Sequence, residues 1–526
     1  MSAAPAARAG RPRQMSWQRP AILGLVLVFW GAALWHLDRF PPIHFDEATI
    51  LEPGYQLYYE GVYGSDMYTG FYGQERLYLE VPPVMSLLQG ASARLLGVGV
   101  WQMRYLPVVF GTLTLALTAA LAARIAGPTA GALAALVLLL WQWTPSGLEF
   151  LGSGLPLLDV ARIARYDILV PVFGLAAFAA WLRANATGRQ RLDFASGVLA
   201  SLAGLANVYG AFWLPALALL TLLDKKGQRS KRLAWLAAGA ALPTMPWLAV
   251  MASHWQDALG QLNKHEGRFD FMQPLFYVDN LFNEPHRYFL GVREAATFLR
   301  LGFWLVVIAL PASLAWLAWR WWWRHDARAG WLLAPALVLP TLLALLDSQK
   351  RFYYLIVVIP VFAIILGWAA AAVWQTGPRV VRALLASMLI GLAAQAALGV
   401  ARQQALAQME RPPAEVFAAL RQAVPPTAGI ILGAPQFWLA LPERDYRSMV
   451  LPFLLSVTSD VKPIPYEQAL GKVAPEIVLM DPSFASNLAP NYTDPFWRYM
   501  AAHRARVIGQ VQDYLGQDVT IYQLEP

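Results

Sequence analysis

Carboxylates and basic residues stand beside several apolar segments of this sequence. Asp46 and Glu47 follow the first apolar run, within "PPIHFDEATI", and Asp167 stands in "RIARYD" directly before a later run. Lys350 and Arg351 precede another run, in "QKRFYY". Carboxylates can accept a proton or hold a metal ion, and fixed cations can stabilise a departing anion. The residue types therefore point to acid–base chemistry on an anionic substrate at the ends of apolar segments.

The carboxylates also have plainer interpretations. Acidic residues are favoured in the first turn of a helix, so Asp46 and Glu47 could simply begin an interfacial helix. Asp167 could be a helix N-cap or the ion-pair partner of Arg165. For each of these residues taken alone, the structural explanation is at least as good as the chemical one, and for Asp167 it is the better one.

Two further segments add candidates with the same ambiguity. Glu80 precedes a Pro-Pro pair, and "NKHEGRFDF" contains His265 and Arg268. A single histidine in a polar loop is usually solvated. Lys350 and Arg351 could be snorkelling residues at a membrane boundary. Only the whole set of polar residues favours a functional site.

The composition decides the class of protein that must position these residues. The 526 residues are 57% hydrophobic and 14% charged, against about 25% charged in soluble domains. Repeated apolar runs predict a polytopic α-helical membrane protein. The net charge of +8 lies in short clusters between these runs, which is typical of cytoplasmic loops and not of a nucleic-acid groove. The absence of cysteine excludes disulfide scaffolds, thiolate metal sites and cysteine nucleophiles.

The basic clusters predict the orientation of the chain. Because Lys and Arg are retained on the cytoplasmic side, residues 1–19, with four arginines, are predicted to be a cytoplasmic tail. No small-residue cleavage site follows, so the first run is predicted to be an uncleaved span. Eleven spans are predicted, at about 20–38, 105–123, 129–146, 167–183, two within 194–223, 233–252, 298–319, one on each side of 347–351, and 383–401.

Outer loops are predicted at 38–104 and 253–297 of a membrane domain that covers residues 20–401. The segment 82–97 is apolar but too short to span, which favours a re-entrant or interfacial helix. Residues 402–526 are predicted to be a small soluble α/β domain on the outer side. Its predicted strands are "GIILG", "PEIVLM", "RVIGQVQDY" and "VTIYQLEP", and its predicted helices are "PAEVFAALRQA" and "FWRYMAAHRA".

This topology brings the candidate polar residues to the outer face, although none of them was used to derive it. Carboxylates with cations at a membrane surface are what glycosyl transfer from a lipid-phosphate sugar requires. A carboxylate takes a proton from the acceptor, the anomeric carbon becomes oxocarbenium-like, and fixed positive charge stabilises the phosphate. We therefore expect an active site outside the cytoplasm.

The ordered motifs resemble the GT-C glycosyltransferases of the ArnT and protein O-mannosyltransferase type, over roughly residues 20–375. The resemblance rests on the acidic pair Asp46-Glu47, on Glu80 before a proline-led helix, and on the segments "QMRYLPVVFG", "RIARYDILVPVF", "LNKHEGRFDF" and "QKRFYYLIVVIPVF". It implies that Asp46 is the catalytic base, that Glu47 shapes the site, and that Asp167 with Arg165 lines the sugar or acceptor pocket.

The resemblance also implies binding roles for the remaining candidates. Glu80 and His265 would hold a divalent metal, zinc or else Mg or Mn. The phosphate of the lipid-linked sugar would meet the cations and tyrosines Lys350, Arg351, Arg268, Tyr353 and Tyr354. One departure matters: a lysine often follows the acid before the prolines in ArnT-like chains, whereas Val81 stands here. Phosphate binding would then depend more on the later cations.

The expected protein is a monomeric, inverting glycosyltransferase of a bacterial inner membrane. It would transfer a sugar from a polyprenyl-phosphate donor to a lipid, glycan or protein acceptor on the periplasmic or extracellular face. A lipid-sugar flippase or transporter would instead carry polar residues on both faces and at the midplane. A non-catalytic assembly or sensor protein would not need the acidic pair.

Overall fold

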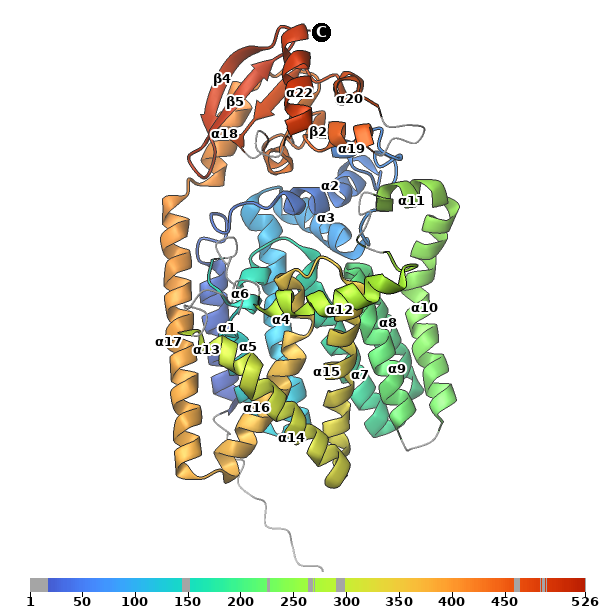
Figure 1. Ribbon diagram of the computed structural model, residues 1–526, viewed down its shortest axis with the longest axis vertical. Helices are drawn as coiled ribbons and strands as arrows, with labels where there is room; N and C mark the ends of the chain where they lie inside the picture. The colour runs from blue at the N-terminus through green and yellow to red at the C-terminus, as the bar shows by residue number, and fades with distance from the viewer. Residues whose placement is uncertain are drawn as a thin grey trace, which may run out of the picture.

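A bundle of apolar helices, a layer of short helices across one end, and an α/β domain beyond that layer make up the chain (Figure 1). The computed structural model describes residues 18–143, 152–224, 228–263, 268, 270–289, 299–457, 464–482, 484, 488 and 490–525. Three of the four N-terminal arginines and His265 lie outside these residues.

Each predicted span coincides with a helix of the described chain. Seven of these helices are long and apolar enough to cross a membrane, which confirms the polytopic helical fold. A π-helical turn, Leu305–Ala309, joins α13 to α14 within a single span. The bundle helices are α1 (Gln18–Leu34), α4 (Val100–Ala126), α5 (Pro128–Leu140), α7 (Leu169–Thr187), α8 (Gln190–Ala206), α9 (Trp213–Leu223), α10 (Arg229–Ser253), α13 (Leu301–Trp304), α14 (Leu310–Trp323), α15 (Ala327–Leu346), α16 (Ile359–Thr376) and α17 (Arg379–Met409).

Short helices from the two outer loops lie across one end of the bundle (Figure 1). The first loop supplies α2 (Phe45–Glu60) and α3 (Val84–Leu96), and the second supplies α11 (Trp255–Asn263) and α12 (Pro274–Phe289). The short helix predicted at 82–97 is α3. Glycines let α2 and α3 touch through their backbones, because a Cβ on Gly54 would lie 1.8 Å from the carbonyl oxygen of Ser86. A Cβ on Gly90 would lie 2.3 Å from the backbone of Gly54.

The C-terminal domain is a five-stranded sheet with the strand order β2-β1-β3-β5-β4. β1 pairs in parallel with β2 and β3, whereas β5 pairs antiparallel with β3 and β4. The four predicted strands are present, and the three-residue β2 was missed because it is too short to show alternation. The elements are α18 (Pro413–Ala423), β1 (Ile431–Gly433), β2 (Tyr446–Ser448), α19 (Leu451–Val457), α20 (Tyr466–Val473), β3 (Ile477–Met480), α22 (Pro490–Ala502), β4 (Arg506–Gln512) and β5 (Asp518–Gln523).

This domain and the first outer loop share one hydrophobic core. Tyr55 of α2 packs edge-on against Trp438, with ring centroids 5.3 Å apart. The hydroxyl of Tyr514 donates to the carbonyl of Ile43, 3.4 Å away, just before α2 begins. The helix that carries Asp46 is therefore held between the bundle and the C-terminal domain.

Candidate active site

Asp46 lies in the first turn of α2, but its side chain is not the cap of that helix. His44 is the N-cap, and its Nδ1 accepts the backbone N–H of Asp46 at 3.1 Å. The carboxylate of Glu47 accepts the backbone N–H of His44 at 2.9 Å and completes a capping box. Burial lowers the pKa of His44, so this imidazole is neutral near pH 7. The carboxylate of Asp46 is left for other partners.

Glu47 is fully buried and binds Arg104 of α4 through two hydrogen bonds of 2.9 and 2.8 Å. It also accepts the backbone N–H of Ala164 at 2.7 Å. Arg104 in turn donates to the carbonyls of Leu37 and Pro42, at 3.1 and 3.3 Å. Glu47 and Arg104 therefore join α2, α4 and the chain that follows α1.

A second buried arginine, Arg162, holds the end of α1. Its guanidinium donates to carbonyls at and just beyond the end of this helix, those of Ala32, Ala33, Trp35, His36 and Phe40. The sequence motifs predicted no role for Arg104 or Arg162. Each stands within or beside an apolar segment, where a lone cation is costly and so marks a buried partner.

Asp46, Arg165 and Asp167 form a row of alternating charge. Arg165 bonds Asp46 through Nη1 and Asp167 through Nε, the latter at 2.9 Å. Asn207 donates to the other oxygen of Asp167 at 3.1 Å. The side chain of Asp46 is 23% exposed, whereas that of Asp167 is only 2% exposed. Asp46 is the end of the row that a substrate can reach.

Tyrosines connect this row to Arg268. The guanidinium of Arg165 lies over the ring of Tyr353, 4.7 Å from its centroid, and Tyr353 meets Tyr354 edge-on. Arg268 donates to the hydroxyls of Tyr354 and Tyr209, at 2.8 and 3.0 Å. The structure thus brings five predicted site residues into one cluster with Asp46.

Lys350 is turned to a neighbouring network. Its Nζ bonds Glu284 of α12 at 3.0 Å and the carbonyl of Ala344 at 2.5 Å. Burial lowers its pKa. Asp347 accepts the hydroxyl of Tyr209 at 2.5 Å and pairs with Arg287 at 2.9 Å, which links this network to the tyrosines. The side chain of Arg351 is exposed.

Glu80 is half-buried, and its Oε2 accepts the side-chain amide of Gln74 at 3.1 Å. Its predicted metal-binding partner, His265, lies outside the described residues. Within the described part of the chain, no group of three or more His, Cys, Asp or Glu side chains could hold a metal ion. The metal site therefore stays a prediction.

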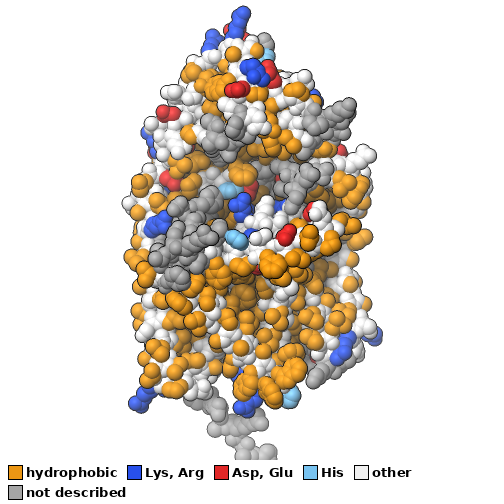
Figure 2. All heavy atoms as spheres, viewed as in Figure 1, with side chains coloured by type: hydrophobic (Ala, Val, Ile, Leu, Met, Phe, Trp, Pro, Cys, Tyr) orange, Lys and Arg blue, Asp and Glu red, His pale blue; other side chains and the backbone are white. Residues whose placement is uncertain are grey.

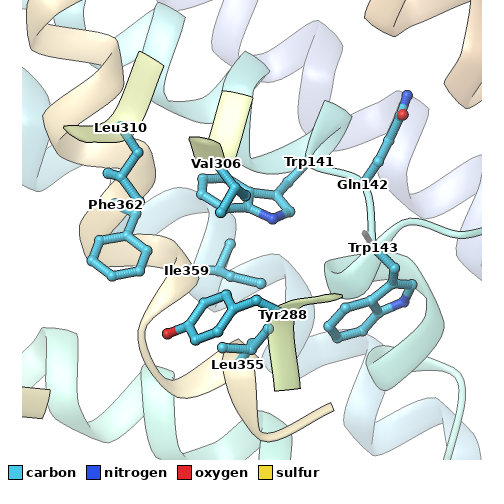
Figure 3. A pocket seen from close by; sticks show the side chains of 9 residues that line it. All are labelled: Trp141, Gln142, Trp143, Tyr288, Val306, Leu310, Leu355, Ile359 and Phe362. Atoms are coloured by element: carbon cyan, nitrogen blue, oxygen red, sulfur yellow. The ribbon is translucent and has the colours of Figure 1, made fainter. Parts of the chain in front are cut away.

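A small apolar cavity of about 10 Å³, with room for roughly one water molecule, lies beside the site tyrosines (Figure 3). Leu355 in its wall directly follows Tyr354, and Tyr288 reaches it from α12. The remaining wall consists of Trp141, Gln142, Trp143, Val306, Leu310, Ile359 and Phe362. The amide of Gln142 points away from the other side chains in Figure 3. An apolar chain suits this lining better than a charged group does.

No protein-family profile and no curated protein matches the chain. Solved structures do match. ArnT from Cupriavidus metallidurans bound to undecaprenyl phosphate is 18% identical with a TM-score of 0.61, over 97% of this chain and 98% of that one. The fold is that of the GT-C glycosyltransferases.

Two structures of the archaeal oligosaccharyltransferase from Archaeoglobus fulgidus share this fold. The complex with an inhibitory peptide and a dolichol-phosphate is 12% identical, with a TM-score of 0.57 over 90% of this chain and 70% of that one. The complex with Zn and sulfate is 14% identical, with a TM-score of 0.51 over 88% and 68%. The fold that the motifs predicted is confirmed.

Proposed function

We propose that this chain is a membrane glycosyltransferase that moves a sugar from a polyprenyl-phosphate donor to an acceptor hydroxyl. The proposal rests on its fold and on structures of that fold whose ligands are undecaprenyl phosphate and a dolichol-phosphate. The observation that carries it is the row Asp46–Arg165–Asp167. That row presents one partly exposed carboxylate, held by a cation, at the end of an apolar bundle.

Asp46 is the proposed general base. It accepts the proton of the acceptor hydroxyl as the hydroxyl oxygen bonds to the anomeric carbon. The bond from that carbon to the phosphate oxygen breaks, and polyprenyl phosphate leaves with the electron pair. Attack from the opposite side inverts the anomeric configuration. Arg165 lies between the two carboxylates and holds that of Asp46 in position.

Arg268 is the proposed cation for the leaving phosphate, because its guanidinium lies among tyrosines that adjoin Arg165. Arg351 is the second proposed cation for the phosphate, because its side chain is exposed. Lys350 already binds Glu284 and the end of α15, so we assign it to holding the loop at 347–351. The apolar side chains that begin at Leu355 would face the polyprenyl chain as it passes the site.

A divalent cation, if used, would be held by Glu80 with His265. The amide that Gln74 donates to Glu80 fits an anionic carboxylate there but occupies one of its oxygens. Two protein ligands leave the remaining coordination positions to water or substrate, where the ion would supply positive charge to the phosphate. All steps above use side chains of the described chain.

The basic clusters support an orientation in which the C-terminal domain and the site are periplasmic or extracellular, in a bacterial inner membrane. The acceptor would be a lipid, a glycan or a protein, and the chain would act as a monomer.

The activity is tested with purified protein in nanodiscs, supplied with radiolabelled polyprenyl-phosphate sugars and membrane extract as the acceptor source. Wild type is expected to produce a labelled product of inverted configuration, and Asp518→Asn, at an exposed position of β5, is expected to match it. Binding of the labelled donor with no transfer to any acceptor would contradict the proposal and favour a flippase.

A further inference from the structure

Helix α12 presents three faces of different chemistry. At 3.6 residues per turn, Asn280, Glu284 and Arg287 share the face that is turned to the bundle. Four large apolar residues share a second, exposed face: Leu275, Val278, Leu281 and Phe282. The third face is exposed and polar, with Asp279, Asn283 and His286.

The inner face fixes α12 at the end of a span. Asn280 donates to the carbonyl of Leu345 at 3.0 Å, and Arg287 donates to that of Leu343 at 3.4 Å. Lys350, which pairs with Glu284, donates to the carbonyl of Ala344 between them. These carbonyls belong to the last turn of α15, where helical N–H donors run out, although that of Leu343 also accepts the backbone N–H of Asp347 at 3.2 Å. Because α15 is long and apolar enough to cross a membrane, α12 lies where that span leaves the bilayer.

The second face is apolar and uncovered in the described structure. The side chain of Phe282 is 78% exposed, and the other three are exposed as well. Met272, just before the helix, is exposed as well. Soluble proteins rarely expose a continuous apolar stripe to water, and such a stripe usually marks a contact with a membrane or a partner.

The polar third face of α12 favours a membrane over a protein partner as the contact of the apolar face. A helix that lies in the plane of a bilayer needs an apolar side toward the acyl chains and a polar side toward water. Asp279, Asn283 and His286 form such a side, directly beside the apolar stripe. At the height where α12 crosses the bundle in Figure 1, Figure 2 shows acidic and histidine side chains above a continuous hydrophobic band. That band continues downward over the bundle.

We propose that α12 binds the bilayer surface on the side of the C-terminal domain. Its apolar stripe lies among the upper acyl chains and its polar face lies in water. Helix α12 contains two carboxylates, Asp279 and Glu284, and one permanent cation, Arg287. Its net charge is therefore −1 when His286 is neutral. The attachment is therefore apolar and needs no anionic lipid. This inference does not depend on the proposed transferase activity.

The chain has no cysteine, so single cysteines can be introduced without a background. The cysteines of Phe282→Cys and Asp279→Cys are each labelled with a nitroxide, and the proteins are placed in phosphatidylcholine nanodiscs. Spin-label relaxation then measures collision with oxygen, which enters the bilayer, and with a nickel chelate, which stays in water. Leu242→Cys on the span α10, 61% exposed, and Val507→Cys on β4, 56% exposed, are the membrane and water references.

The oxygen-to-nickel ratio is expected to be several-fold higher for Phe282→Cys than for Asp279→Cys, and to lie nearer that of Leu242→Cys than that of Val507→Cys. Leu275→Cys reads the same face should Phe282→Cys fail to fold. A water-like ratio at both positions would overturn the proposal, as would shielding from both reagents, which a protein partner would cause. Replacing part of the phosphatidylcholine with phosphatidylglycerol should leave the ratio unchanged, and a large increase would overturn the apolar attachment.

Discussion

Asp46 and Glu47 are adjacent in the sequence but have opposite surroundings. The carboxylate of Asp46 is partly exposed and meets Arg165, whereas that of Glu47 is fully buried against Arg104. The same turn of α2 thus separates a group that a substrate can reach from one that holds the fold. We infer that Asp46 acts in the reaction and that Glu47 positions it.

Glu47→Gln is expected to destabilise the protein, because it leaves the cation of Arg104 buried without its partner. Removing one member of a buried ion pair costs about 3–5 kcal/mol. Thermal unfolding in detergent should therefore show a clearly lower midpoint for Glu47→Gln and little change for Asp46→Asn. Equal midpoints for the two variants would refute the division of roles.

The sequence motifs predicted one shared site and, by resemblance, roles for Asp46 and Glu47, but not the contacts that hold these residues. Asp46, Arg165 and Asp167 were expected together, and they are together. The difference between Asp46 and Glu47 depends on Arg104, 57 positions away, and on which side chain faces it. The contact of Lys350 with Glu284 likewise joins two loops. Such pairings arise from packing, so the local sequence does not reveal them.

The elements around the site are positioned by close packing of α2. Its middle touches α3 at Gly54, and its carboxylate Glu52 accepts the hydroxyl of Ser65 and, at 3.0 Å, the backbone N–H of Met67. Neither contact is at the site itself. Both fix the angle at which α2 brings Asp46 to Arg165.

Gly54→Ala is expected to force α2 and α3 apart, since the new Cβ would overlap the carbonyl of Ser86. Overpacking of this kind costs about 1–3 kcal/mol. Gly31→Ala on α1 is the matched control, because a Cβ there meets nothing within 4 Å. Unfolding midpoints should fall for Gly54→Ala only. A normal midpoint for that variant would contradict the packing described.

Glu52 makes stability depend on pH. Burial raises its pKa to about 8, so the folded protein keeps the proton that the unfolded chain has already lost. The contribution of Glu52 to the free energy of unfolding is complete below about pH 4.3, the ordinary pKa of glutamate. It declines as pH rises and is gone above about pH 8. Glu52→Gln keeps an oxygen for Met67 without titrating. Its unfolding midpoint should vary less than that of wild type between about pH 5 and 9, and parallel curves would exclude this role.

At the scale of the whole molecule, the outer layer links the bundle to the C-terminal domain. The hydropathy of the sequence predicted the spans because each is apolar along most of its length, and alternation predicted four strands. The packing of the domain on α2 was not predicted, since Tyr55–Trp438 and Tyr514–Ile43 connect residues hundreds of positions apart. The predicted boundary at residue 402 stays untested, and α17 itself continues to Met409.

Polar residues are not confined to the end with the proposed site. At the other end of the bundle, Arg232 of α10 pairs with Asp193 of α8 and with Asp224, at 3.0 and 2.6 Å. The three residues join neighbouring helices where a basic loop was predicted. We interpret these ion pairs as structural, because each charge in the network is paired and the network holds neighbouring helices together.

The most direct test of the central claim compares donor binding with sugar transfer in wild type and Asp46→Asn. Both proteins, in nanodiscs, receive a radiolabelled polyprenyl-phosphate sugar that wild type has first been shown to transfer. Asp46→Asn is expected to bind this donor as tightly as wild type but to lose most of its transfer in a single turnover, because the base is gone while the cations remain. Equal transfer by the two proteins would show that Asp46 is not the base and would contradict the account.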